Sequence, residues 1–347
     1  MAQIVLGLGT THSPMLNLSA GQWRHRANVD QSNASLALSD GRRLSYAELQ
    51  AERGARFVDQ LEPAKLEAKA AACHAALDRL ADALERAAPD VVLIVGDDQS
   101  ELFSADCQPT FAIYHGETIV TTIGKYGKEA PAWMLQIGKG FLMDDHHSIA
   151  GAPEFAVRLI EGLMEHGADV TAVASVRDPS RAGFGHAYGF IVKRLLRRPV
   201  PIVPVLLNTY YPPNVPTASR CLDLGHKLRA VVEAMPGPTR VALVASGGLS
   251  HFVVDEDLDR AVLAAFRDKD DAALRRIPQH VFRSGTSETL NWILLAGAVT
   301  ALPLQMAEYH ALYRTEVGTG VGAGFCIWAH EPLPASPPER PLSGDPS

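Results

Sequence analysis

The sequence predicts an α/β fold: one domain over residues 1–330, with a central mixed β-sheet and helices on both faces. Short apolar runs without polar alternation, such as 3–9 (QIVLGLG) and 91–95 (VVLIV), are typical of strands buried on both sides. Between such runs lie segments with apolar residues at three- and four-residue steps, as in 63–88. Strands that alternate with helices indicate a largely parallel or mixed sheet with two covered faces.

The elements follow each other in that alternation. Pro63 opens the long helix, and Pro89-Asp90 ends it. We expect further strands at 110–114, 169–174, 200–207, 240–246 and 323–329, and helices at 153–166, 186–197, 217–234, 257–267, 270–276 and 287–299.

Three segments do not fit the alternation. Residues 20–60 are polar and contain turn formers, so we expect an elaborated loop that could serve as a built-in lid. Residues 116–150 are Gly-rich and receive no assignment. The 331–347 tail holds several Pro, Ser and Gly residues, and we expect it to be disordered.

Composition argues against several classes of protein. The 347 residues carry a net charge of −7 without a Lys/Arg run, which disfavours a nucleic-acid partner. There is no apolar stretch long enough to cross a membrane, and the N-terminus lacks the charged region of a signal peptide. The four cysteines are widely spaced and form no CxxC motif, which disfavours a zinc ribbon or a disulfide framework. These features favour a cytoplasmic protein with reduced thiols.

Polar residues directly follow three of the predicted strands. His12 comes after the first strand, the turn 97–100 after VVLIV, and His251 after the strand at 240–246. In open α/β sheets, ligands bind beyond the carboxyl ends of the strands. We therefore expect these three segments to meet at one edge of the sheet. The acidic residues Asp97, Asp98 and Glu101 could alternatively form a simple surface turn.

Eight short motifs occur in a characteristic order. They are THSP (11–14), PDVVLIV (89–95), PTFAIY (109–114), GFGHAYGFI (183–191), IVPVLLNTYYPP (202–213), GGLSH (247–251), SGTSETLNW (284–292) and GTGVGAGF (318–325). In this order, from about residue 2 to 329, the chain resembles the class III extradiol ring-cleavage dioxygenases, in particular the β-subunit of protocatechuate 4,5-dioxygenase and its gallate and 3-O-methylgallate relatives. The resemblance implies an enzyme that opens a catechol-type ring, methoxylated and gallate-like rings included, with O2.

The resemblance also implies a metal centre of two histidines and one carboxylate that holds Fe(II), with Mn(II) as the alternative. His12 matches the first histidine ligand and Glu288 the carboxylate. The second histidine should follow VVLIV, where the sequence instead has Gln99. Other residues could take this position, namely Ser100, Asp98, His115, His146, His147 and His25.

The same resemblance implies roles for the remaining polar residues. His186 matches the acid/base histidine, and His251 matches a second histidine near the reaction. Ser250 and Thr319 are expected to contact the substrate. The implied partners are a small aromatic substrate and O2, a second copy of the chain in a homodimer, and for some relatives a small capping subunit. The alternatives are an oxygenase for an aminophenol or hydroxypyridone, and a metal-free binding protein on the same fold.

Overall fold

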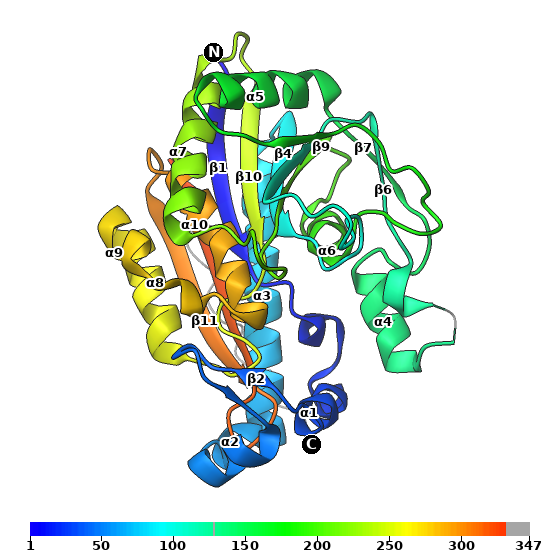
Figure 1. Ribbon diagram of the computed structural model, residues 1–347, viewed down its shortest axis with the longest axis vertical. Helices are drawn as coiled ribbons and strands as arrows, with labels where there is room; N and C mark the ends of the chain where they lie inside the picture. Colours follow the sequence, from blue (N-terminus) through cyan, green and yellow to red (C-terminus); the bar gives the residue numbers. More distant parts are fainter. Residues whose placement is uncertain (128, 331–347) are drawn as a thin grey trace, which may run out of the picture.

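An eight-stranded mixed sheet lies at the centre of the computed structural model, which describes residues 1–127 and 129–330 (Figure 1). The sheet consists of β1 (Gln3–Thr10), β4 (Val91–Asp97), β5 (Phe111–Tyr114), β8 (Thr171–Val173), β9 (Ile202–Leu207), β10 (Arg240–Ser246), β11 (Leu304–Tyr313) and β12 (Gly320–Ala329). Two small antiparallel pairs are β2 (Leu36–Ala37) with β3 (Arg43–Leu44), and β6 (Thr118–Val120) with β7 (Ser148–Ala150).

The helices are α1 (Arg24–Gln31), α2 (Tyr46–Arg53), α3 (Pro63–Ala87), α4 (Ala132–Gly140), α5 (Pro153–Glu165), α6 (His186–Leu195), α7 (Ala218–Ala234), α8 (Glu256–Asp268), α9 (Asp271–Arg276) and α10 (Thr289–Ala298). The strand order is β11-β12-β1-β10-β4-β9-β5-β8. The four central strands β1, β10, β4 and β9 are parallel, whereas β12 and β5 run antiparallel to their neighbours in this group. The carboxyl ends of β1, β10, β4 and β9 therefore lie at one edge of the sheet.

Helices cover both faces of the sheet, which confirms the predicted fold class. Side chains of a strand alternate between its two faces. In β4, Leu93 and Val95 pack into the core under α5, α7 and α10, while Val92 and Ile94 pack into the core under α3 and α6. Both faces need apolar residues, so the run VVLIV shows no polar alternation.

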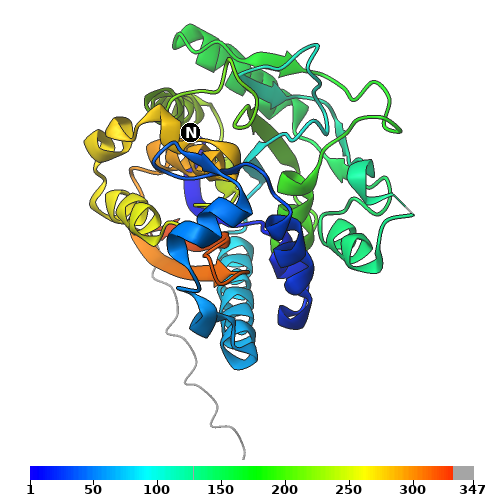
Figure 2. The ribbon, with the colours of Figure 1, turned by 60° about the horizontal axis from the view of Figure 1, so that its bottom comes forward.

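Some elements were not predicted. The edge strand β11 has a half-buried pattern over most of its length, so it lacks the continuous apolar run that marks the inner strands. The region 20–60 contains two short helices, α1 and α2, which lie at the end of the sheet towards which the parallel strands run (Figure 1, Figure 2). The predicted tail 331–347 lies outside the described residues. Within the described ranges, no helix combines the length and apolarity that a bilayer span requires.

Candidate active site

The parallel strands deliver several polar side chains to one cavity. His12 follows β1, Asp97 ends β4, Tyr210 follows β9, and His251 follows β10. All except Asp97 line a cavity of about 190 Å³. This confirms the expectation that segments following separate strands meet at one edge of the sheet.

His12 and Glu288 are in direct contact. The distance between His12 Nε2 and Glu288 Oε2 is 3.2 Å, and both side chains are buried. Glu288 ends the 3-10 turn Ser284–Glu288 and also accepts hydrogen bonds from the Gly248 N–H (2.8 Å) and the Tyr210 hydroxyl (2.7 Å). Two segments that are far apart in the sequence therefore present their side chains to the same point.

The hydrogen bonds of His12 define which ring nitrogen faces the site. Ser246 Oγ donates its proton to Ala187 O (2.7 Å), so it must accept from His12 Nδ1 (2.9 Å). In the neutral ring, His12 Nε2 then carries a lone pair that faces the Glu288 carboxylate. Two acceptors at this distance require a cation or a shared proton between them, which is the arrangement of a metal-ligating histidine.

Asp97 was not foreseen as part of this group. Its side chain is fully buried, and its Oδ1 has no hydrogen-bond partner among the described residues. Burial raises the pKa of Asp97, and the charge of Glu288 raises it further. One ligand atom each from His12, Asp97, His186 and Glu288 lies within 4.8 Å of the others. Nitrogen and carboxylate oxygen donors around an unpartnered buried oxygen fit a divalent metal ion.

His186 is oriented by the buried carboxylate of Glu101. Its Nδ1 lies 2.9 Å from both oxygens of Glu101, so Nδ1 carries the proton. Its Nε2 lies 3.2 Å from the Gln99 amide nitrogen and 3.6 Å from Asp97 Oδ2. The neutral ring thus presents an acceptor nitrogen to the site.

The acidic segment at the end of β4 is not a surface turn. Asp97, Asp98 and Glu101 are all buried. The Asp98 carboxylate accepts the N–H groups of Leu102 and Phe103, and burial raises its pKa to about 7. Asp98 therefore closes the loop instead of joining the candidate metal ligands. The alternative of a surface turn is wrong, because the polar sequence alone does not indicate that this turn is buried.

Gln99 lines the cavity, as its predicted position requires, and its amide lies 3.3 Å from Asp97 Oδ2. The alternative histidines have other contacts. His146 Nδ1 bonds Thr121 O, His147 Nε2 bonds Asp144, and the His25 ring stacks on Trp133. Neither these three nor His115 belongs to the buried group of candidate ligands. Ser100 has a positive φ of 61° in the same turn as Gln99.

His251 contacts the carboxylate of Glu288 on the side away from His12. The distance from His251 Nε2 to Glu288 Oε1 is 3.2 Å. Burial alone would raise the pKa of Glu288, but the adjacent His251 and His12 rings outweigh it and hold that pKa well below its ordinary value. The groups around Glu288 therefore favour its charged form.

Ser250 and Thr319 do not line the cavity. The Ser250 hydroxyl donates to Asp259 Oδ2 (2.6 Å), and the Thr319 hydroxyl pairs with that of Thr315 (2.8 Å). Their contact with a substrate stays a prediction. Tyr210, in contrast, lines the cavity and bonds Glu288, although its sequence context suggested only a proline-rich turn.

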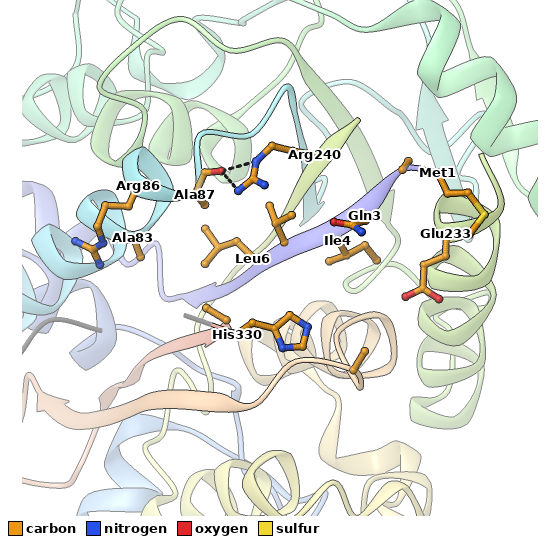
Figure 3. Close-up of a pocket in the computed structure, with 14 residues that line it drawn as sticks. Met1, Gln3, Ile4, Leu6, Ala83, Arg86, Ala87, Glu233, Arg240 and His330 are labelled. Carbon is orange, nitrogen blue, oxygen red and sulfur yellow. Dashed lines mark hydrogen bonds between the residues drawn. The ribbon is translucent and has the colours of Figure 1, made fainter. Parts of the chain in front are cut away.

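A larger cavity, of about 740 Å³, lies at the opposite end of β1 (Figure 3). It is lined by apolar residues such as Ile4 and Leu6 and by a few charged ones. Its Arg240 donates to the carbonyl of Ala87. None of the candidate metal ligands of the described residues faces it, so the smaller cavity is the candidate active site.

A buried ion pair fixes the region 20–60 against the sheet. Arg314, just after β11, bonds Asp30 of α1 with Nε–Oδ2 and Nη2–Oδ1 distances of 2.7 and 3.2 Å. Both side chains are at most 3% exposed. Removal of one partner leaves the other charge buried and unpaired.

We expect Asp30→Ala to lower the free energy of unfolding by about 3–5 kcal/mol in urea titrations. The control is Asp78→Ala, which breaks an ion pair with Arg194. The Asp78 side chain in this pair is 61% exposed. That change should cost less than about 1 kcal/mol. Equal losses in the two variants would mean that the Asp30 pair contributes no more than a surface pair.

Comparison with known proteins identifies the family. Residues 57–325 match the family described as the catalytic LigB subunit of aromatic ring-opening dioxygenase, and the chain belongs to this family. His186, His251 and Glu288 fall inside the matched span, whereas His12 precedes it. This confirms the resemblance drawn from the motifs.

Two characterised relatives are similar over part of the chain. A 2,3-dihydroxyphenylpropionate/2,3-dihydroxicinnamic acid 1,2-dioxygenase from Comamonas testosteroni is 27% identical over 49% of this chain and 45% of its own length. A gallate dioxygenase from Pseudomonas putida is 29% identical over 41% of this chain and 44% of its own length. The chain thus matches less than half the length of each relative.

Proposed function

We propose that this protein is a metal-dependent extradiol dioxygenase that opens a catechol-type aromatic ring with O2. The family and the two relatives support the reaction class. The observation that carries the proposal is the contact between His12 Nε2 and Glu288 Oε2 at 3.2 Å, with Asp97 and His186 in the same buried group.

In this proposal, His12 and Glu288 hold the metal, and the end of β4 supplies the third ligand through Asp97 or Gln99. Fe(II) is the proposed ion, with Mn(II) as the alternative for an oxygen-rich set of ligands. When bound, such an ion lowers the pKa of a coordinated phenol and provides a site for O2. The Tyr210 hydroxyl and the Gly248 N–H keep both Glu288 oxygens in position.

The protein's own groups then manage protons and water. His186 accepts a substrate hydroxyl proton at Nε2, because Glu101 holds the proton on Nδ1 and stabilises the resulting imidazolium. The same nitrogen returns this proton during ring opening. Apolar side chains of α4, including Trp133 and Ile137, line the cavity and limit the access of water. His251 is a second proton carrier next to Glu288.

The test combines metal analysis with oxygen consumption. Protein purified without O2 is expected to bind one Fe(II) per chain and to consume O2 with catechols. His12→Ala should lose the metal, whereas the control His146→Ala should retain it, because the His146 ring bonds the Thr121 carbonyl and lies outside the buried group of candidate ligands. Absence of metal binding at any stoichiometry would favour a metal-free binding protein. Turnover confined to aminophenols or hydroxypyridones would favour that alternative.

The proposal further includes a homodimer in the cytoplasm, with α1 and α2 at the cavity in the place of a capping subunit. Arg26 of α1 lines the cavity, which supports a covering role for this region. Chromatography with light scattering measures the number of chains per particle.

A further inference from the structure

Asp259 of α8 is a buried carboxylate that lies outside the active-site cavity and takes no part in the reaction proposed above. It is 1% exposed, and burial raises its pKa to about 6. Its oxygens accept hydrogen bonds from the Ser250 N–H (2.8 Å), the Ser250 hydroxyl (2.6 Å) and the Tyr309 hydroxyl (2.8 Å). A carboxylate in this environment costs free energy that an apolar side chain would not. Two of its three hydrogen bonds come from the residue that precedes His251.

The His251 ring is held in one orientation by the backbone around it. Its Nδ1 donates to the Leu249 carbonyl (3.0 Å), so Nε2 is the nitrogen that faces Glu288 Oε1 at 3.2 Å. The other side of the ring lies against the backbone of Gly285, where an added Cβ would clash with it. Because neighbouring backbone confines the ring in this way, its place at Glu288 follows the backbone of residues 249–251.

This backbone is itself fixed from two sides. On one side, Thr286 Oγ1 accepts the His251 N–H (3.0 Å), and the Thr286 hydroxyl and N–H both donate to the His251 carbonyl (2.9 and 3.0 Å). On the other side, Ser250 donates twice to Asp259, and its hydroxyl also accepts the N–H of Asp255, the N-cap of α8 (2.8 Å). The first turn of α8, which packs against β11 (Figure 1), therefore holds the segment that carries His251.

We propose that Asp259 is a positioning residue, which fixes the backbone of His251 through Ser250 and so keeps His251 Nε2 in contact with Glu288. In this proposal Ser250 acts through Asp259, in place of the contact with substrate that the family resemblance implies for it. The inference rests on the proposed function for the role of His251 as a proton carrier. The placement of the ring does not depend on the reaction, so the two can be tested separately.

The first measurement reads the position of the His251 ring without turnover. Nitrogen NMR signals of the His251 imidazole are recorded on the full chain and assigned by their loss in His251→Gln. In Asp259→Asn these signals should shift, because asparagine has an NH2 donor in place of one of the two acceptor oxygens. Tyr309→Phe is the matched control, since it removes one hydrogen bond of Asp259 but keeps both bonds from Ser250. It should leave the His251 signals unchanged.

The second measurement is a double-mutant cycle on the metal-loaded chain, with O2 consumption as the readout. Asp259→Asn is expected to lower kcat about 10- to 100-fold, the loss that a small misplacement of a reacting group causes. The same change made in His251→Gln should have little further effect, because the ring that Asp259 positions is already absent. Asp271→Asn, which changes a partly exposed partner of His226 in the next helix, should leave kcat unchanged in both backgrounds.

Unchanged His251 signals in a folded Asp259→Asn variant would overturn the inference. If Asp259→Asn does not fold, Ser250→Ala takes its place, because it removes the hydroxyl donor and should shift the same signals. If the signals shift but the intact protein opens no catechol, the inference stands and the dioxygenase proposal fails. If the intact protein turns over and Asp259→Asn lowers kcat by the same factor with and without His251, the dioxygenase proposal stands and the inference fails.

Discussion

Replacement of His186 by glutamine is expected to lower ring-opening turnover by about 100- to 10,000-fold, the range contributed by general acid–base groups. Glutamine retains a polar side chain of similar reach but cannot take up and return a proton near neutral pH. The geometry motivates the expectation, because Glu101 fixes the proton on Nδ1 and Nε2 remains an acceptor in the cavity.

Metal content must be measured on the same His186→Gln samples. We expect it to stay at the value of the unchanged protein, because His12 and Glu288 remain in place. Loss of the metal together with activity would instead make His186 a ligand, which its position within the buried group also permits. Near-full activity would show that another group handles the proton. His147→Gln is a suitable control, because this half-exposed ring bonds only Asp144 among the described side chains.

The inner part of the fold was predictable because burial on both faces leaves a strong mark in the sequence. The strands β1, β4, β9 and β10 are apolar throughout, and the long helix α3 has a regular apolar stripe. Edge elements lack such marks. The polar helix α1 is held by the Asp30–Arg314 ion pair, a contact between residues that no local pattern connects. For α2, the capping box of Ser45 and Glu48 was a usable signal.

The candidate site was predictable only where a motif marked it. His12, His186, His251 and Glu288 were identified through the family resemblance, and they meet in or beside one cavity. Asp97 and Glu101 are not recognisable from the sequence as buried residues of the site, because an acidic turn is normally solvated. Their burial follows from the packing of α6 against β4 and the loop after it, which is a tertiary contact. The sequence alone does not indicate which polar residues are buried by tertiary contacts.

Asp97→Asn is expected to weaken metal binding at least about 100-fold, the upper end of losses from changes next to a ligand. Among the described residues, Asp97 Oδ1 has no hydrogen-bond partner, and the carboxylate lies within the group of candidate ligands. Asp97 is therefore the strongest candidate for the third ligand. Asparagine keeps the size of the side chain but removes its charge. Metal titration of the metal-free protein with Fe(II), without O2, gives the dissociation constant.

Unfolding of the metal-free protein separates a lost ligand from a damaged fold. Without the ion, Asp97 and Glu288 are two buried carboxylates in one group, and each disfavours the charge of the other. Asp97→Asn should therefore leave the melting temperature of the metal-free protein equal or higher, and reduce only the increase that the metal provides. Gln99→Ala is the matched variant, since Gln99 lies at the same end of β4 and lines the cavity. A large loss of metal affinity in Gln99→Ala, with little change in Asp97→Asn, would assign the third ligand position to Gln99 and reject Asp97. The reason is that a carboxylate ligand cannot lose its charge without a loss of affinity for the metal ion.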